Sequence, residues 1–228
     1  MVGLRGGLVL GDGSRGSSGG WWVLTLWPWE EGGWEPGLVW LLYTRVPAGV
    51  GPPRRWRGLV GYGRLDVAAR VMLAALYPGR RLLEGDAMLV YLDAGGSGED
   101  GGVLVLEPGC LPGGMVYERE AASVLLEALR GRRCRRLSGV TLRGLLLAAG
   151  RRGYRRVGLR EGGERLRPPR GRLLLLLGGA VDPPWRLVEG AIDVWAGVGC
   201  RSYLASTVAA YVNAYRLLKA AGRVGAVR

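Results

Sequence analysis

The stretch LLLLLGGAVDPPWRLVEGAIDVWAGVGCRSYLASTVAAYVNAYRLL, residues 173–218, decides the fold class of this chain. Its five leading leucines predict a strand buried on both faces, and this strand ends at Gly178 and Gly179. A second apolar run, residues 191–196, ends in the glycine loop 196–199, and a helical pattern follows to residue 218. Two strands that each end in glycines are typical of an open α/β sheet, which binds ligands beyond the carboxyl ends of its strands.

Glycine loops of this kind have two interpretations. Without a Cβ, glycine lets a small cofactor approach main-chain amides and carbonyls. Glycine after a strand also serves ordinary turn chemistry, which needs no ligand. The loop GAVDPP, residues 179–184, lacks a GxGxxG pattern, so a Rossmann dinucleotide site is not supported.

The alternation of strands and helices extends toward the amino terminus. Strands are predicted at residues 38–43, 87–92, 103–106 and 155–159, and helices from residue 65 to Pro78, at 117–130, and at 142–149 with Thr141 as N-cap. DAGGSGEDGG, residues 93–102, predicts a hairpin tip, and EGGE, residues 161–164, predicts a turn. Continuous apolar strands between helices predict an α/β fold with a mostly parallel sheet covered on both faces.

Residues 1–37 differ from the rest because they combine glycine and serine clusters with five tryptophans and keep no period for long. They predict a poorly ordered extension, with residues 38–228 as one domain. A tail folded onto the core and a misassigned start codon remain open alternatives. The tryptophans could also stack on nucleobases.

Composition narrows the function classes. A chain of 228 residues can bury one sizeable core. It carries no apolar run of the length a membrane span needs and no convincing signal peptide, so a cytoplasmic protein without a membrane partner is predicted. Histidine is absent and the three cysteines are widely spaced, so no metal site is expected.

The charge balance points to nucleic acid. The formal net charge is +13, and Lys219 is the only lysine, so the excess is arginine, whose planar fork matches phosphate oxygens. Codon bias in a GC-rich genome is the competing explanation. Such bias chooses arginine over lysine but does not create an excess of 32 basic over 19 acidic residues.

The segment GYGRLDVAAR, residues 61–70, places Arg64 and Asp66 at the start of a predicted helix and Arg70 one turn further on. A carboxylate there complements the positive end of the helix dipole, and a neighbouring arginine is often its surface partner. Spacing alone therefore does not require a catalytic role.

The order of the motifs resembles the Nep/Emg family of pseudouridine N1-methyltransferases of small-subunit ribosomal RNA, which belong to the SPOUT class. The residues that carry the resemblance are GRLDVAARVMLAAL (63–76), VLVLEPGCLP (103–112), SGVTLRGLLLAA (138–149), LLLLLGGAVDPP (173–184) and VWAGVGCRSYLASTVAAYVNAY (194–215). The resemblance implies a SPOUT-type α/β fold with a trefoil knot. It also implies a homodimer to which the final helix contributes.

By the same resemblance, the knot's loops would hold S-adenosylmethionine largely through backbone atoms. The residues implied to bind this cofactor are Gly178, Gly179, Trp195, Ala196, Gly197, Val198, Gly199 and Cys200, with Tyr203 and Leu204 closing over it. The family's catalytic arginine and aspartate correspond to Arg64 and Asp66. Asp66 would accept a hydrogen bond from N1 of a flipped-out pseudouridine and take or relay its proton as the methyl group moves.

The sequence departs from the family where Cys110 and Gly113 stand in place of expected arginines. The residues predicted to contact RNA are Arg64, Arg70, Arg119, Arg132, Arg133, Arg135 and Arg136. The resemblance implies methylation of N1 of a pseudouridine in small-subunit (16S) rRNA, with a role in ribosome small-subunit biogenesis. Two alternatives remain: a tRNA pseudouridine N1-methyltransferase, which GRLD at residues 63–66 also fits, and a non-catalytic RNA-binding assembly factor.

Overall fold

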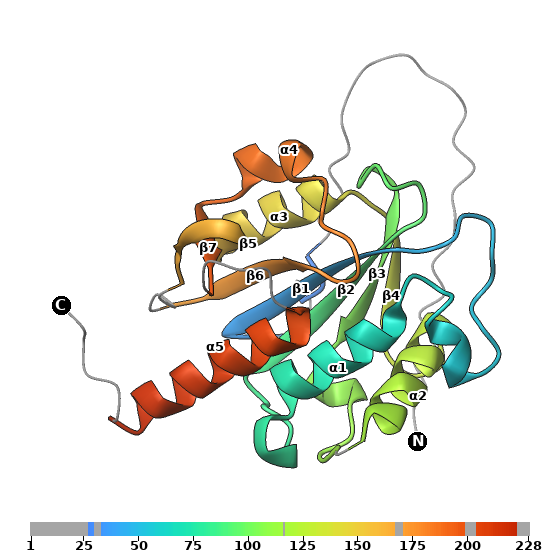
Figure 1. The fold of residues 1–228 in the computed structure, drawn as a ribbon, viewed down its shortest axis with the longest axis horizontal. Helices are drawn as coiled ribbons and strands as arrows, with labels where there is room; N and C mark the ends of the chain where they lie inside the picture. The colour runs from blue at the N-terminus through green and yellow to red at the C-terminus, as the bar shows by residue number, and fades with distance from the viewer. Residues whose placement is uncertain (1–26, 30–32, 116, 167–170, 199–203, 223–228) are drawn as a thin grey trace.

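The computed structural model describes residues 27–29, 33–115, 117–166, 171–198 and 204–222. Within these residues seven strands form one sheet in the order β4-β3-β2-β1-β6-β5-β7 (Figure 1). The strands are β1 (Leu38–Arg45), β2 (Asp86–Asp93), β3 (Gly101–Leu106), β4 (Arg135–Val140), β5 (Arg155–Arg165), β6 (Leu173–Gly178) and β7 (Val194–Gly197). The predicted mixed α/β architecture is confirmed.

The centre of the sheet is parallel, as the continuous apolar runs predicted. Strand β1 pairs in parallel with β2 on one side and with β6 on the other, and β5 joins β6 and β7 in parallel. Only β3 runs against its neighbours, because β2 and β3 form the predicted hairpin. The central strands are buried on both faces, which is why they lack polar alternation.

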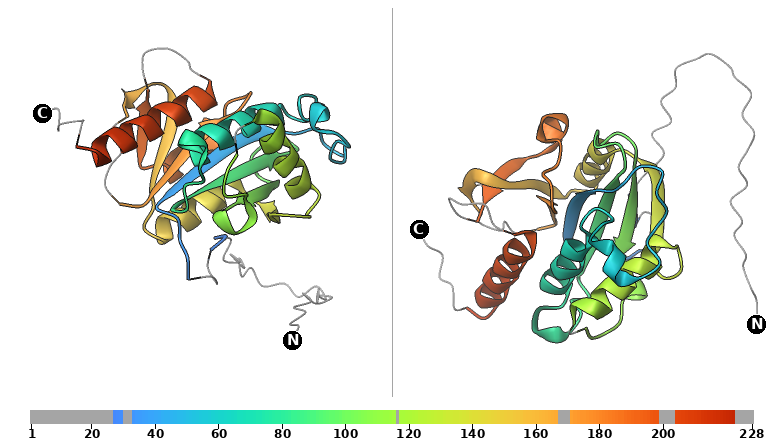
Figure 2. Two further views of the ribbon diagram at one scale, coloured as in Figure 1. Left: turned by 90° about the horizontal axis from the view of Figure 1, so that it is seen from below. Right: turned by 45° about the vertical axis from the view of Figure 1, so that its right-hand side comes forward.

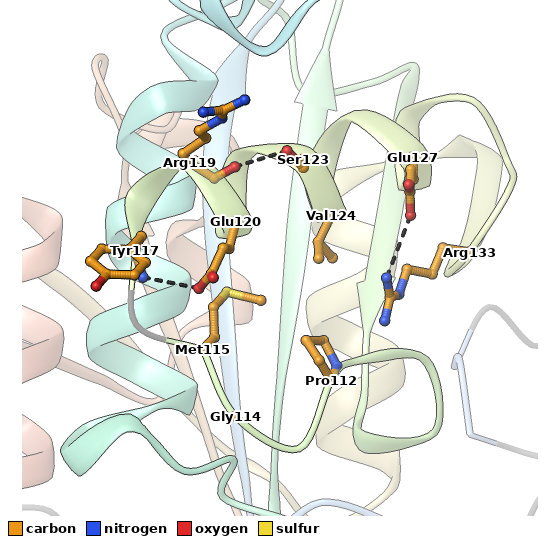
Figure 3. A pocket seen from close by; sticks show the side chains of 10 residues that line it. All are labelled: Pro112, Gly114, Met115, Tyr117, Arg119, Glu120, Ser123, Val124, Glu127 and Arg133. Atoms are coloured by element: carbon orange, nitrogen blue, oxygen red, sulfur yellow. Dashed lines mark hydrogen bonds and ion pairs between the residues drawn. The ribbon is translucent and has the colours of Figure 1, made fainter.

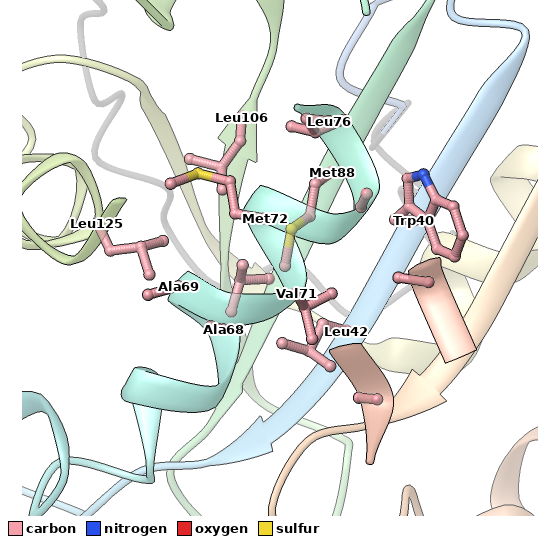
Figure 4. Packing of buried hydrophobic residues seen from close by; sticks show 14 of the residues in the cluster. Trp40, Leu42, Ala68, Ala69, Val71, Met72, Leu76, Met88, Leu106 and Leu125 are labelled. Carbon is pink, nitrogen blue, oxygen red and sulfur yellow. The ribbon is translucent and has the colours of Figure 1, made fainter. Parts of the chain in front are cut away.

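Helices cover both faces of the sheet (Figure 2). On one face lie α1 (Leu65–Leu76), α2 (Glu118–Leu129) and α5 (Ala205–Ala220), and on the other lie α3 (Leu142–Arg151) and the short α4 (Trp185–Val188). Figure 4 shows part of the first core, where Met72 of α1 lies beside Leu106 and Leu125, and Trp40 and Leu42 of β1 lie farther along the same cluster. Helix α1 ends just before Pro78, which cannot continue a helix.

Helix α5 is tied to α1 and to the sheet by polar contacts in its second half. The amide of Asn213 donates to Ala74 O at 2.8 Å and to Ala75 O at 2.7 Å. Arg216 makes a two-pronged contact with the buried carboxylate of Asp86, at 2.5 and 3.0 Å. These contacts set α5 beside α1 with both helices beginning at the edge where the parallel strands end.

Two tryptophans of the predicted extension are buried. Trp27 and Trp29 are each 4% exposed, and the ring of Trp27 lies 4.9 Å from that of Tyr154 between centroids. The Trp29 indole donates to Glu107 at 2.5 Å. Residues 1–26 and 30–32 lie outside the described residues, so poor order there stays a prediction.

Three local features differ from the sequence prediction. The basic segment 131–136 leads into β4, an edge strand whose exposed residues gave no apolar alternation. EGGE lies within β5, where the register with β7 shifts between Leu159 and Glu164. The second glycine-ended strand is shorter than expected, because residues Glu189–Ala191 form a 3-10 helix before β7.

A disulfide joins Cys110 to Cys134. Antiparallel pairing of β3 with β4 brings the turn after β3 beside the start of β4, and this pairing places the two cysteines together. In the described part of the chain, no helix has the length and apolar character needed to cross a membrane.

Candidate functional site

The end of β1 anchors both motifs that the sequence singled out. The amide of Gly179, in the loop after β6, donates to Tyr43 O at 2.8 Å. The hydroxyl of Thr44, the next residue along β1, donates to Gly63 O at 2.5 Å. The predicted cofactor loop and the predicted catalytic turn are therefore fixed to consecutive residues of one buried strand.

The turn that precedes α1 is tightly built. Gly63 has φ +71°, and a Cβ on it would lie 2.2 Å from Arg45 O, so only glycine fits. Arg64 follows with φ 55° and ψ 40°, a left-handed conformation that is uncommon for a residue with a side chain. This backbone lets the Arg64 side chain fold back onto the first turn of α1.

Asp66 is held between two arginines. Arg64 approaches it with Nε at 3.0 Å from Oδ1 and Nη2 at 3.1 Å from Oδ2, and Arg70 Nη2 lies 2.6 Å from Oδ2. The Asp66 side chain is 16% exposed. Its pKa is lowered, chiefly by the hydrogen bonds from Arg64. Burial, the next largest effect, opposes this, and the charges of Arg64 and Arg70 and the hydrogen bond from Arg70 lower the pKa further. Asp66 is thus a carboxylate at neutral pH, with both oxygens already accepting hydrogen bonds.

The glycine loop after β6 needs glycine for its own turn, whether or not a ligand binds. A Cβ on Gly178 would lie 2.7 Å from Val181 O, so this glycine is needed for the turn itself. The following residues Ala180, Val181 and Asp182 are exposed. Gly178 and Gly179 are themselves partly exposed, and their contact with a cofactor stays a prediction.

The end of β7 is packed rather than open. The ring of Trp195 lies across Gly158, with the Arg160 guanidinium 4.3 Å from its centroid and the Trp185 ring 5.4 Å away. Ala196 is buried, and Gly197 O accepts a hydrogen bond from Leu166 N at 2.8 Å. Val198 packs against the α1 side of the core. Of the predicted cofactor residues beyond it, Leu204 precedes α5 and is 66% exposed, whereas Gly199, Cys200 and Tyr203 lie outside the described residues.

The arginines predicted to bind RNA fall into two groups. Arg64, Arg70 and Arg119 belong to the first, because Arg70 Nε lies 3.7 Å from Glu118, the neighbour of Arg119 in the first turn of α2. The second group comprises Arg132, Arg133, Arg135 and Arg136, which follow α2 and enter β4.

Three members of the second group serve contacts within the protein. Arg133 donates to Cys110 O at 2.7 Å and pairs with Glu127 at 3.5 Å, Arg135 pairs with Glu107 at 3.1 Å, and Arg136 donates to Leu129 O at 3.0 Å. Figure 3 shows Arg133 and Glu127 beside a hollow of 850 Å³, from which the Arg119 side chain points away.

A buried aspartate at the same sheet edge was missed by the sequence interpretation. Asp93 is fully buried at the end of β2, and its carboxylate accepts hydrogen bonds from the amides of Gly95, Gly96 and Gly98 at 2.7 to 3.1 Å. The Tyr43 hydroxyl donates to it at 2.6 Å. Burial, together with this neighbouring carboxylate, raises the pKa of Tyr43 to about 12. An aspartate followed two residues later by glycine was the available signal, since that pattern favours a side-chain turn.

Comparison with known proteins locates the fold. No family model matches the chain, and no curated protein matches it in sequence. Among solved structures, it is similar to Archaeoglobus fulgidus Nep1 bound to S-adenosylhomocysteine, with 17% identity, a TM-score of 0.50, and coverage of 81% of this chain and 99% of that chain. The chain therefore has the mixed α/β fold of that structure, and its sequence resemblance to the Nep/Emg family agrees with the match at the level of the fold.

Proposed function

We propose that this protein is an S-adenosylmethionine-dependent RNA methyltransferase that modifies N1 of a pseudouridine in small-subunit ribosomal RNA and acts in the biogenesis of that subunit. The observation that carries the proposal is the anchoring of the Arg64–Asp66 turn and the Gly179 loop on Tyr43 and Thr44 of β1. The same fold occurs in a protein solved with S-adenosylhomocysteine, the product left by a methyl donor of this kind.

The exposed turn 180–182 and the chain from Gly197 to Val198 would hold the cofactor. They combine main-chain polar groups, the apolar side chains of Ala180, Val181 and Val198, and the carboxylate of Asp182, a mixture that suits a nucleoside-containing ligand. Bound there, S-adenosylmethionine would supply an electrophilic methyl group on its sulfonium sulfur. The protein's own task is then to bring N1 of the base into line with that methyl group.

Asp66 is suited to orient the base and poorly suited to deprotonate it in advance. The two arginines that lower its pKa keep it ionised, and a carboxylate with a lowered pKa is a weak base. It can accept a hydrogen bond from N1–H and receive or pass on the proton only as the N–methyl bond forms. The Arg64 side chain is 51% exposed and can pair with a phosphate while it holds Asp66.

A homodimer would cover part of α5. Leu217 and Leu218, near its carboxyl end, are 53% and 44% exposed. Light scattering of the purified protein measures its mass in solution, and a monomer at micromolar concentration would contradict the dimer.

Calorimetry with S-adenosylmethionine tests the enzyme first. Absence of binding at millimolar cofactor would overturn the proposal, and RNA binding without cofactor binding would identify a non-catalytic assembly factor. Mass spectrometry of nucleosides from rRNA and tRNA incubated with protein and cofactor then distinguishes the ribosomal substrate from tRNA.

Asp66→Ala tests the catalytic assignment. Methylation is expected to be abolished with RNA affinity largely intact. The matched control is Asp193→Ala, which also removes an aspartate paired with an arginine, Arg156 at 2.5 Å. Asp193 immediately precedes β7, at the end of the strand away from the Gly197–Val198 segment. A fully active Asp66→Ala protein would show that the assignment is wrong.

A further inference from the structure

A second basic surface lies between α2 and the loop that contains residues 54–57. This groove encloses 410 Å³. Its lining residues are Arg54, Arg55, Trp56 and Arg57 from the loop and the 3-10 helix Trp56–Leu59, and Arg119, Ser123 and Leu126 from α2. Figure 1 shows this short helix beside α2. Only Arg119 was singled out from the sequence.

The loop that forms one wall is held by its backbone. Arg130, the residue that follows α2, donates to Pro53 O at 3.0 Å and to Arg54 O at 2.8 Å. Gly58 N donates to Arg55 O at 2.9 Å, and Leu59 is fully buried beneath the loop. The wall is thus formed before any ligand arrives, while the side chains of Arg54, Arg55 and Arg57 remain exposed.

The groove carries positive charge that the protein does not neutralise. Among the described residues, none of its four arginines makes an ion pair, in contrast to Arg133 and Arg135. Guanidinium forks bind phosphate oxygens in two-pronged fashion. Four such groups around one hollow fit a chain of phosphates.

The presence of Trp56 in the groove favours a nucleic acid over other anionic ligands. Trp56 is 37% exposed as a residue, and the Arg57 guanidinium lies 5.5 Å from the centroid of its ring. An exposed indole among arginines is the combination with which proteins stack the bases of single strands while holding their phosphates. An acidic peptide would use the arginines but would leave the ring without a stacking partner.

A series of contacts links the groove to the candidate catalytic turn. Asp66 pairs with Arg70, Arg70 lies 3.7 Å from Glu118, and Glu118 is followed by Arg119 at the groove. We propose that the groove binds single-stranded RNA flanking the nucleotide presented to Asp66. The inference rests on the proposed function for the identity of that RNA, and it assigns to residues 54–57 the phosphate contacts that Cys110 and Gly113 do not provide.

Fluorescence anisotropy with a labelled single-stranded RNA of mixed sequence, without cofactor, tests the groove over a series of salt concentrations. The full-length variants are Arg54→Ala/Arg55→Ala and Trp56→Ala. The control Arg143→Ala/Arg151→Ala removes the same charge from α3, on the opposite face of the sheet. Circular dichroism checks that each variant is folded.

Each variant has its own expected signature. The double arginine variant should bind RNA at least tenfold more weakly and lose about 1.4 from the slope of log affinity against log salt, roughly 0.7 per phosphate contact. Trp56→Ala should weaken binding about tenfold with the slope unchanged, because stacking releases no counterions. The control should bind like the parent.

Two results would overturn the inference. One is normal RNA affinity in both groove variants. The other is competition by polyglutamate as effective as that of RNA, together with no effect of Trp56→Ala, which would identify a docking surface for acidic protein. Methyl transfer is assayed separately. If the parent protein is active and the groove variants bind RNA normally, only the groove assignment is wrong. If the parent protein is inactive but its RNA binding depends on the groove, only the proposed function is wrong.

Discussion

At the scale of the residue, Asp66 combines two roles that sequence spacing could not separate. As the partner of Arg64 and Arg70, it complements the amino end of α1 and stabilises the left-handed backbone before it. As a carboxylate at the sheet edge, it is the group proposed to orient a base. The first role supports the second, because the hydrogen bonds from Arg64 and Arg70 favour one orientation of the carboxylate.

Replacement of Asp66 with asparagine should have a pH-dependent cost. The folded-state pKa of Asp66 is lowered, so its ion pairs stabilise the fold fully above the unfolded pKa of about 3.9 and lose that effect as the pH falls through the folded value. Asp66→Asn should lower the free energy of unfolding by about 1 kcal/mol at pH 7, a modest figure because Arg64 is half exposed. Urea unfolding at pH 7 and pH 2.5 measures it. An equal loss at both values would mean that charge is not the cause.

Gly63→Ala should be among the more damaging small substitutions. The added Cβ would meet Arg45 O at 2.2 Å, and φ is +71°. The expected loss is about 3 kcal/mol, from strain together with displacement of the turn. Gly153→Ala is the control, since φ is +79° there but nothing lies within 4 Å of the new Cβ, so only about 1 kcal/mol should be lost. Thermal unfolding of both variants compares them, and equal losses would show that the contact with Arg45 is unimportant.

At the scale of the element, β1 organises the candidate site through Tyr43 and Thr44, near its carboxyl end. Tyr43 accepts the Gly179 amide at its carbonyl and donates its hydroxyl to Asp93, and Thr44 donates to Gly63. The loops that follow β2 and β6 and the turn before α1 are thereby fixed relative to each other. A buried central strand can do this because its neighbours end at the same edge.

Tyr43→Phe should remove the alkaline sensitivity that this arrangement creates. The folded pKa of Tyr43 is about 12, above its unfolded value near 10, so the stabilisation is complete below pH 10 and is lost as the pH rises toward 12. The variant should lose about 1 to 2 kcal/mol at pH 7, where Asp93 lacks one donor, and should destabilise less steeply above pH 10. Urea unfolding from pH 7 to pH 11 measures both effects. Tyr117→Phe, with a side chain 67% exposed in the parent, should change neither.

Helices and strands were predicted well from the sequence where burial imposes an apolar pattern on the residues. They were predicted poorly where pairing with a distant strand determines the structure. The leucines of β6 and the Thr141 cap, which accepts from Gly144 N at 2.9 Å, were correctly predicted because their signals are local. Strand β4 was missed because an edge strand can be polar along most of its length. The Cys110–Cys134 disulfide depends on that strand pairing, so spacing along the chain could not reveal it.

The candidate site shows the same limit. Arg64, Asp66 and Arg70 could be grouped from sequence, because the start of one helix brings them together. Residues 54–57 could not be assigned to a surface, since they lie in a loop whose wall is completed by α2, more than 60 residues later. The ring of Trp195 packs against Gly158, Arg160 and Trp185, a set of contacts that the sequence did not reveal, whereas the predicted contact of its backbone with a cofactor stays a prediction.

At the scale of the whole molecule, α5 connects opposite ends of the fold. Its first residues lie at the carboxyl ends of the parallel strands, where the candidate site is. Its second half is anchored at the amino ends of those strands, where Asn213 binds the last turn of α1 and Arg216 binds Asp86. Few polar contacts hold this helix, and several of its residues are exposed. The anchor should therefore control how firmly the helix holds the chain beyond Val198.

Loss of the Asn213 anchor should be felt at the candidate site. Asn213 is 2% exposed, so Asn213→Ala leaves Ala74 O and Ala75 O without their side-chain donor inside the protein and should cost about 2 kcal/mol. Hydrogen exchange should show α5 losing protection while β1 keeps most of its own, because α5 can open locally. Affinity for S-adenosylmethionine should fall in parallel, since part of the proposed cofactor loop leads directly into this helix. Lys219→Ala, an exposed change in the last turn of α5, serves as the control and should alter neither measurement. Uniform loss of protection across the sheet and α5 would show that the helix unfolds only with the whole domain, and that Asn213 contributes to global stability alone.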